Sequence, residues 1–178
     1  HRDSLDESVV FEAGRFDEDS DYLNCPMSEP EYVAFIAALN EGEAPEGHDW
    51  DVVPYFEGCL PVEVMASRGL DTLRFGPMKP IGLTDPRTGE RPWAVVQLRR
   101  EDRAGQMWNM VGFQTRLRIG EQRRVFTTIP GLGDADFLRW GSIHRNSYLN
   151  FPERLSRYGA PAAHPDLLFA GQLTGVEG

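Results

Sequence analysis

The segment WAVVQLRREDRAGQMWNMVGFQT (93–115) decides the fold prediction for this chain of 178 residues. Residues 93–100 are rich in apolar and β-branched side chains and predict a central strand. EDRAG (101–105) predicts a tight turn, and MWNMVGFQT (107–115) predicts a second strand that returns beside the first. We therefore expect a sheet that contains this pair.

Upstream, SEPEYVAFIAALNEG (28–42) predicts an amphipathic helix. Ser28 and Glu31 have the spacing of a capping box, Pro30 suits the first helical turn, and Gly42 suits the end. One apolar stripe is expected to face the core: Tyr32, Phe35, Ile36 and Leu39.

Other segments complete the expected fold. GEQRRVFTTI (120–129) predicts a helix, and DPRTGE (85–90) predicts a tight turn. Residues 1–24 are polar and acidic and predict a surface connection, and 142–150 are expected to be extended. DLLFAGQLTGVEG (166–178) predicts a buried strand that runs into a glycine turn. In the helix predicted over 120–129, Val125, Phe126 and Ile129 are expected to face the core.

The composition indicates a globular α/β (mixed α+β) protein, with 40% apolar and 11% aromatic residues. The sequence contains no run of 18 apolar residues, so no transmembrane helix is expected. Two cysteines are too few for a disulfide framework. A cytoplasmic protein with free thiols and no membrane association is expected. Because the chain opens with His1 rather than Met, and ends on a glycine turn, we expect a fragment of a longer protein.

The charge is unevenly distributed around a net value of −10. Residues 1–58 contain 2 basic and 16 acidic side chains, whereas 68–124 contain 12 basic and 6 acidic ones, a net of +6. Two interpretations of the basic stretch stay open. It is either a solvated surface or a contact for nucleic acid or another anion, which needs only local positive charge.

The stretch YFEGCLPVEVMASRG (55–69) raises a chemical question, because Cys59 stands two residues before Pro61, which opens a short predicted helix over 61–68. The positive end of a helix favours a thiolate, the reactive form of cysteine. A small buried residue is the alternative interpretation. Cys25 also precedes a helix, but at a greater distance. Two acidic side chains oppose thiolate formation at Cys59: Glu57 and Glu63.

Three other groups are candidates for binding. Glycines after a strand, here in 171–178, allow a phosphate or a flat cofactor to approach the backbone, although an ordinary turn explains them equally. His144, Arg145 and Asn146 offer a titratable ring, a cation and an amide, but a lone histidine is more often structural. A set of arginines flanks GFQT: Arg116, Arg118, Arg123 and Arg124. No metal-ligand spacing, Ser-His-Asp signature or P-loop occurs.

Together these segments resemble the folate- and FAD-dependent tRNA uracil-5-methyltransferases. The resemblance runs from residue 21 to residue 178, and it is more distant to the FAD-dependent tRNA wobble-uridine modifying proteins, which lack the FEGC stretch. It rests on these motifs: YLNCPM, YFEGCLPVEVMASRG, TLRFGPMKPIGLTDPRTGERP, AVVQLR, NMVGFQT, GEQRRVF, IPGL, HRN and LFAGQLTGVEG.

The resemblance implies a Rossmann-type FAD-binding domain interrupted by an insertion domain with a mixed sheet and short helices. Residues 1–24 would be a linker or edge of the FAD-binding domain, 25–139 the insertion domain, and 140–178 the return to the FAD-binding domain. The family's nucleotide-binding glycine fingerprint would lie upstream, so the fragment alone is not expected to hold FAD firmly or to be active.

The resemblance also implies an activity. The family transfers a one-carbon unit from methylenetetrahydrofolate to C5 of a T-loop uridine in tRNA, using FAD and NAD(P)H. Cys59 matches a family cysteine implicated in adding to uracil C6, and a protective or binding role for this thiol is the alternative. A non-catalytic RNA-binding or structural insertion module of a flavoprotein is the alternative function.

The implied binding residues fall into two sets. The flavin-side residues are Gly171, Gln172, Thr174, Gly175 and Gly178. The substrate-binding residues are His144, Arg145, Asn146, Arg123 and Arg124. NSYLNFP (146–152) departs mildly from the usual sequence of the family. The resemblance therefore does not assign the contacts of the residues around this segment.

Overall fold

The computed structural model describes residues 1–17, 22–45, 60–143, 156, 158–161, 163–169 and 171–174. The chain forms two compact units, His1–Ile143 and His144–Gly178. Among the described residues, no helix is both long enough and apolar enough to cross a lipid bilayer.

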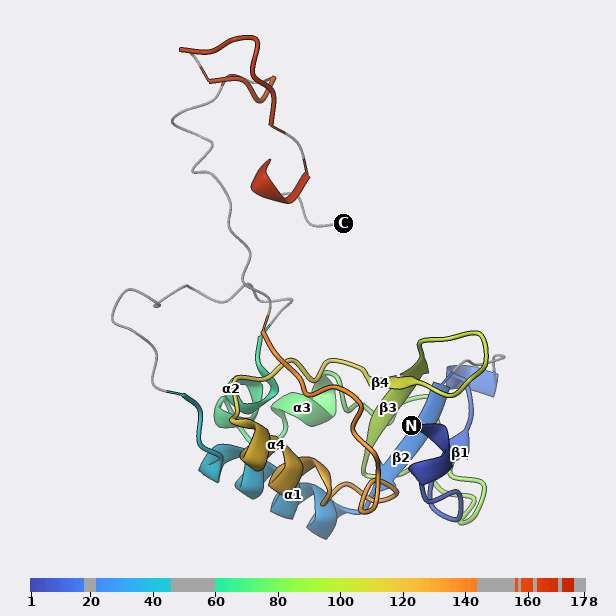
Figure 1. The fold of residues 1–178 in the computed structure, drawn as a ribbon. Coiled ribbons are helices and arrows are strands. Elements are labelled where there is room, and N and C mark those ends of the chain that lie inside the picture. The colour runs from blue at the N-terminus through green and yellow to red at the C-terminus, as the bar shows by residue number, and fades with distance from the viewer. Residues whose placement is uncertain are drawn as a thin grey trace. The chain divides into compact units, whose positions relative to one another are not determined.

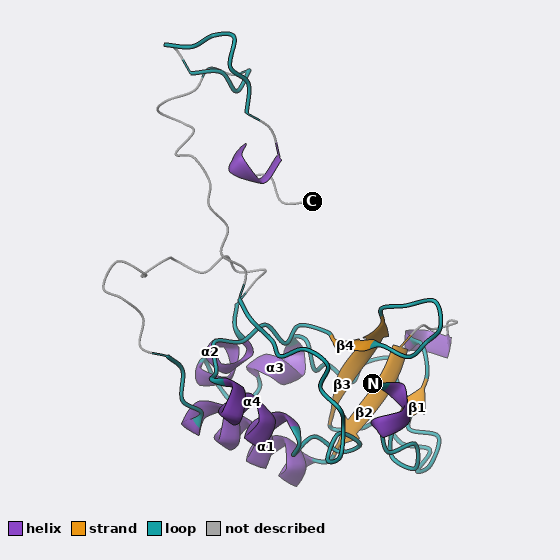
Figure 2. Ribbon diagram, viewed as in Figure 1, coloured by secondary structure: helices purple, strands orange, loops and turns teal. Residues whose placement is uncertain are grey.

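The first unit contains a sheet of four strands in the order β1-β2-β3-β4, which is also their order along the chain (Figures 1 and 2). The strands are β1 (Phe11–Glu12), β2 (Tyr22–Met27), β3 (Ala94–Arg100) and β4 (Trp108–Met110). All three neighbouring pairs are antiparallel. The predicted strand pair is confirmed as β3 and β4, although β4 is shorter than the predicted 107–115.

The helices of this unit are α1 (Glu29–Glu41), α2 (Val62–Ser67), α3 (Thr72–Phe75) and α4 (Ile119–Phe126). Two short 3-10 turns, η1 (Arg2–Ser4) and η2 (Arg15–Asp17), precede them. The helices predicted over 28–42, 61–68 and 120–129 are confirmed, with ends shifted by one to three residues. The short helix α3 was not predicted, because its segment is dense in glycine and proline.

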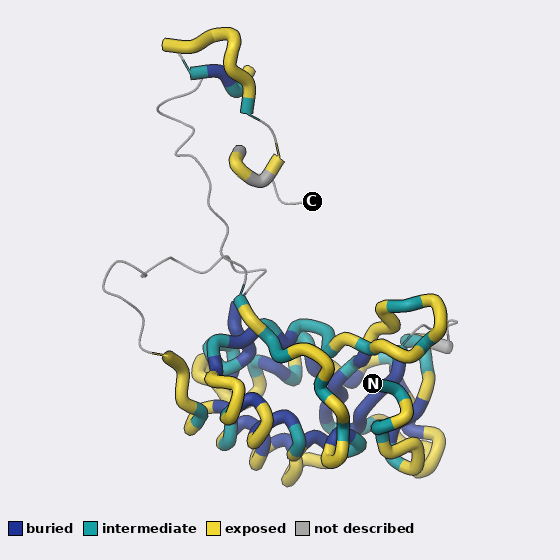
Figure 3. The backbone as a smooth tube through the Cα atoms, viewed as in Figure 1, coloured by how far each residue is buried: buried dark blue, intermediate teal, exposed yellow. Residues whose placement is uncertain are grey.

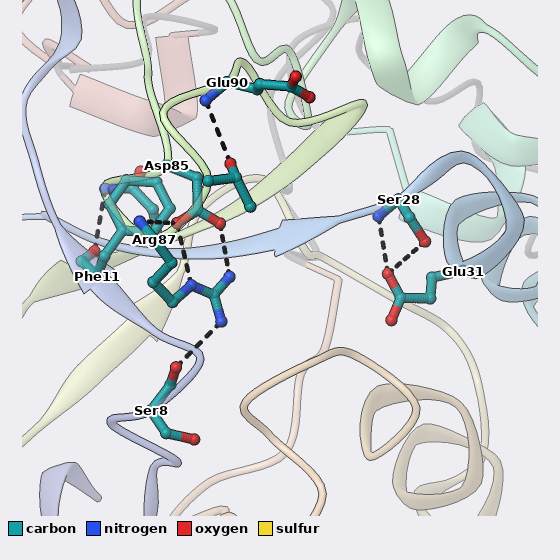
Figure 4. Close-up of polar contacts among 9 residues, drawn as sticks. Ser8, Phe11, Ser28, Glu31, Asp85, Arg87 and Glu90 are labelled. Carbon is teal, nitrogen blue, oxygen red and sulfur yellow. Dashed lines mark hydrogen bonds and ion pairs between the residues drawn. The ribbon is translucent and has the colours of Figure 1, made fainter.

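Helix α1 begins as its sequence predicts. The Ser28 backbone N–H and hydroxyl donate to the same Glu31 carboxylate oxygen at 2.7 and 2.6 Å (Figure 4). These bonds satisfy groups that the helix leaves unpaired at its start. The predicted apolar stripe is buried, as are the predicted inward residues of and after α4: Tyr32, Phe35, Ile36, Leu39, Val125, Phe126 and Ile129.

The core lies between the helices and the sheet, where the buried residues concentrate (Figure 3). A chain of aromatic rings crosses it. The Phe113 ring lies 6.2 Å from Phe35 on α1 and 5.8 Å, edge on, from Phe126 on α4. Phe137 continues the chain from Phe126 and stacks on Trp140 at 4.8 Å. Such contacts fix α1 and α4 against the segment that follows β4.

The predicted turn over 85–90 is confirmed. The Asp85 N–H donates to the Glu90 carbonyl at 2.9 Å, and the Gly89 N–H donates to the Asp85 carbonyl at 2.8 Å. Arg87 donates to both carboxylate oxygens of Asp85 at 3.0 and 2.6 Å, and to the Ser8 carbonyl at 3.1 Å (Figure 4). The bonds from Arg87 hold the pKa of Asp85 below its usual value. The turn therefore ties the N-terminal segment to the sheet.

The surface connection expected over 1–24 is wrong for the described part of that segment. Val10, Phe11 and Leu23 are buried, and the segment contributes two strands. Its backbone also bonds to distant residues, because the Arg2 N–H donates to Gln106 and the Asp6 N–H donates to Gly131. Polar composition misled the prediction, since a few apolar side chains of the segment, among them Val10, Phe11 and Leu23, point inward.

The buried strand expected at 166–178 is also wrong for the residues described. Leu167 and Leu168 are 48% and 68% exposed, and Gly171–Thr174 form a 3-10 turn, η4. A strand needs a neighbour for its backbone N–H and C=O groups. The described elements of the second unit include no strand that could serve as one.

Candidate functional site

The candidate residues differ in how far the structure describes them. Cys59, His144, Arg145, Asn146, Gly175 and Gly178 lie outside the described residues. Gly171, Gln172 and Thr174 lie in η4 of the second unit. Arg123 and Arg124 lie on the exposed side of α4. The site is therefore built from the described residues that flank Cys59 and from α4.

Helix α2 starts three residues after Cys59, at Val62. Leu60 is buried, and Val62 is the first helical residue. Pro61, which was predicted to open the helix, stands one residue before it at the N-cap position. The Val62 N–H, however, donates to the Gln114 carbonyl at 2.7 Å. One of the free N–H groups that the thiolate hypothesis counted on is therefore already used.

Glu63 is also engaged. One of its carboxylate oxygens accepts from the Thr115 hydroxyl at 2.8 Å, and the other accepts from the Arg116 N–H at 2.7 Å. We expected Glu63 to oppose thiolate formation at Cys59. Its carboxylate accepts both of these hydrogen bonds from the segment after β4. The expected effect of Glu63 on Cys59 stays a prediction, because Cys59 lies outside the described residues.

Helix α4 holds the backbone of Gly141 in place. Gln122, which is buried on α4, donates from Nε2 to the Leu117 carbonyl at 2.7 Å and to the Gly141 carbonyl at 3.0 Å. The Gly141 N–H donates back to Gln122 Oε1 at 2.9 Å. Pairing both backbone groups of one residue with one amide fixes the chain at Gly141, three residues before His144.

Sequence reasoning did not find Thr115, Gln122 or Gly141. The only signal was that GFQT and GEQRRVF belong to the motifs that carry the family resemblance. Their contacts join residues 19 to 52 positions apart, so no local spacing could show which partner each side chain takes.

The arginines of α4 are not equivalent. Arg124 donates to Glu121 at 3.1 and 2.7 Å and to the Ala38 carbonyl at 3.3 Å. Arg123 is exposed and makes no ion pair or side-chain hydrogen bond with the part of the chain that the structure describes. On α4, Arg123 is therefore the cation best placed to meet an external anion.

Much of the basic stretch is neutralised within the protein. Five of its arginines pair with carboxylates: Arg74, Arg87, Arg99, Arg118 and Arg124. Four of the partner carboxylates lie within 68–124 and are already counted in its net charge of +6, and only Glu43, the partner of Arg118, lies outside the stretch.

Comparison of the sequence with known proteins shows the family of this chain. The sequence pattern of the family described as "Glucose inhibited division protein A" matches residues 1–178, the whole chain. The chain belongs to this family.

Curated relatives agree with the family resemblance drawn from the motifs. The chain is 57% identical over 178 residues to the methylenetetrahydrofolate–tRNA-(uracil-5-)-methyltransferase TrmFO of Geotalea uraniireducens, covering 99% of this chain and 41% of that protein. It is 58% identical to the protein of the same name from a Synechococcus strain, covering 99% of this chain and 40% of the relative. The chain thus spans about two fifths of the length of the curated relatives it matches.

In this member of the glucose inhibited division protein A family, Cys25 is a core residue. It lies on β2 opposite Val96, and its side chain is 0% exposed. Burial raises the pKa of its thiol from 9.0 to about 12. A buried thiol with this pKa is neutral and inert near neutral pH, which supports the structural interpretation of Cys25.

Two results are expected for Cys25. In a Cys59→Ala chain, a thiol reagent should not label Cys25 at pH 8 until the protein is unfolded. Because the folded-state pKa is raised, the stability linked to this thiol is present below about pH 9 and lost as the pH rises toward 12. A Cys25→Ala variant should lack this alkaline loss of stability in urea melts. In the labelling experiment, rapid reaction of the native chain would show that the Cys25 thiol is accessible and would contradict its place in the core.

Proposed function

We propose that this chain is part of an enzyme that methylates C5 of a T-loop uridine in tRNA, with methylenetetrahydrofolate as the carbon donor. The observation that carries the proposal is the identity of 57% over 99% of the chain to a relative named for this reaction. FAD is the proposed redox cofactor and NAD(P)H its reductant. The direct test is transfer of labelled carbon from the folate to tRNA.

The proposed role of Cys59 follows from the chemistry of uracil. C5 is a poor nucleophile until a group adds at C6, and a thiolate is suited to that addition. Addition of the Cys59 sulfur to C6 moves the electron pair of the C5–C6 double bond toward C5 and O4. C5 then bonds to the one-carbon unit as its bond to the folate nitrogen breaks, and loss of the C5 proton leaves a methylene group on C5. A hydride, which reduced FAD would supply, would convert this methylene to the methyl group, and the electron pair released would expel the sulfur and restore the C5–C6 double bond.

The flavin is assigned to the segment that begins at Gly171. Gly171 has φ +69°, and a Cβ built there would meet no atom within 4 Å. This fits a backbone that a flat ring or a phosphate can approach closely. Gly171, Gln172 and Thr174 would hold the cofactor together with Gly175 and Gly178, and bound FAD would supply the carbon and hydride handling.

RNA contact is proposed for Arg123, supported by its exposure and its lack of a partner among the described residues. His144, Arg145 and Asn146 are proposed to bind substrate or folate, on the family resemblance. A tRNA-modifying enzyme with a free, buried thiol at Cys25 fits the cytoplasm, where thiols stay reduced.

The two arginines of α4 give a matched test. Arg123→Ala in the full-length enzyme should weaken tRNA binding and lower the slope of log K against log salt by about one unit, the value for one phosphate contact. Arg124→Ala should leave the slope nearly unchanged, because its guanidinium is bonded to Glu121. Equal slopes for the wild type and Arg123→Ala would place Arg123 outside the RNA interface.

A further inference from the structure

The ring of Phe75 is presented to solvent at the end of α3, where the residue is 72% exposed. The backbone beneath it is fixed, because the Phe75 N–H donates to the Asp71 carbonyl at 2.9 Å and the Gly76 N–H donates to the Leu73 carbonyl at 3.1 Å. Single exposed apolar side chains are common on protein surfaces. The surroundings of the ring therefore decide what it can bind.

A fixed cation lies beside this ring. The guanidinium carbon of Arg74 is 5.6 Å from the centroid of the Phe75 ring and 4.0 Å from that of the Trp93 ring. Arg74 Nε also donates to the Trp93 carbonyl at 3.0 Å, and the Arg74 side chain is only 21% exposed. Arg74 therefore joins a half-buried ring to an exposed one. We call Arg74, Phe75 and Trp93 the Phe75 platform.

A second cation stands next to the platform. Lys79 is exposed and makes no ion pair or side-chain hydrogen bond with the residues that the structure describes. Its backbone N–H donates to the carbonyl of Gly76, the residue after Phe75, at 3.3 Å. One acidic group lies nearby, the carboxylate of Asp71, at 3.9 Å from Arg74. The ammonium group of Lys79 is therefore available to an external anion close to the exposed ring.

An open aromatic ring with adjacent cations suits single-stranded nucleic acid. A base stacks on the ring, and a cation meets the phosphate beside it. Loops of folded RNA supply such unpaired bases. An apolar surface of another protein fits less well, because it would strip water from the Lys79 ammonium group without replacing its hydrogen bonds.

Resting on the function proposed above, we propose that the Phe75 platform binds an unpaired base of the tRNA substrate, with Lys79 on the adjoining phosphate. An enzyme that acts on a base must take it out of its stack, which costs free energy. Stacking of a loop base on Phe75 offsets part of that cost. The platform contributes to binding and takes no part in the chemical steps.

The stack and the charge have separate signatures in binding of an unmodified tRNA transcript by the full-length enzyme. Phe75→Ala should weaken binding roughly 5- to 100-fold, the range for loss of one base–aromatic stack, and leave the slope of log K against log salt unchanged. Phe75→Tyr keeps the ring and should bind as the wild type does. Lys79→Ala should lower the slope by about 0.7 units, the value for one contact with a single strand.

Two controls separate the platform from exposed rings and from charge in general. Phe16 is 71% exposed but has no cation over its ring among the described residues, so Phe16→Ala should leave tRNA affinity within about twofold. Inorganic polyphosphate carries charge without bases. Its affinity should be unchanged in Phe75→Ala and reduced in Lys79→Ala.

The possible outcomes are distinct. Equal tRNA affinities for the wild type and Phe75→Ala would overturn the inference, as would equal losses for Phe75→Ala and Phe16→Ala. A lower thermal midpoint for Phe75→Ala with unchanged tRNA affinity would show that another part of the protein covers the ring. If the wild type transfers folate carbon to tRNA while Phe75→Ala binds tRNA normally, only this inference fails. If the wild type neither binds tRNA nor transfers the carbon, the proposed function fails with it.

Discussion

Replacing Cys59 with alanine in the full-length enzyme is expected to lower methyl transfer to tRNA roughly 1,000-fold, because the proposed covalent route through uracil C6 would be lost. That factor corresponds to about 4 kcal/mol of transition-state stabilisation. Flavin content should be unchanged, since the flavin-side residues lie elsewhere in the sequence. The measurement is initial-rate transfer to a tRNA transcript, with the flavin absorption recorded for each preparation.

Cys25→Ala is the matched control within the same chain. Cys25 is fully buried on β2, so its removal should lower stability through lost packing and leave the chemistry intact. Near-normal turnover by Cys59→Ala would show that the Cys59 thiol has no chemical role and serves only as a small apolar side chain. It would then favour the alternative function, a non-catalytic RNA-binding or structural insertion module.

Phe35→Ala should destabilise the first unit by about 3–5 kcal/mol, the usual cost of removing a large buried aromatic side chain. Phe35 is 1% exposed and lies against Phe113 in the ring chain that joins α1 to α4. Urea unfolding followed by circular dichroism measures the change. Val33→Ala on the same helix is the control, because Val33 is 42% exposed and its loss should cost less than about 1 kcal/mol. Equal midpoints for the two variants would contradict the assigned core.

The elements that sequence predicted well have local causes. Helix α1 followed from a capping box and an apolar stripe, both visible within one segment. Strand β2 was missed because its first residues belong to a polar, acidic segment, and it also contains Pro26, a residue that is rare in central strands. The structure shows why it is tolerated there: Pro26 lies opposite Val95, whose N–H donates to the Met78 carbonyl instead of to β2. No ladder bond between this pair is lost to the proline.

The candidate site was predictable only in part, for a physical reason. A helix start at Pro61 is a local property, whereas the bonds of its first turn to Gln114, Thr115 and Arg116 depend on the folded chain. The two arginines of α4 show the same limit. Their spacing predicts that they diverge, but only the fold shows that Arg124 reaches both Glu121 and Ala38.

The central claim is that this chain belongs to an enzyme that builds a methyl group on tRNA from folate carbon. The most direct measurement supplies the full-length protein with methylenetetrahydrofolate labelled with carbon-13 at its one-carbon unit, reduced nicotinamide and an unmodified tRNA transcript. Mass spectrometry of the digested RNA then locates the label. The account predicts carbon-13 in a methyl group on C5 of one T-loop uridine, and none when folate is omitted or Cys59 is replaced. Unlabelled tRNA from a preparation that holds flavin and binds the transcript would contradict it.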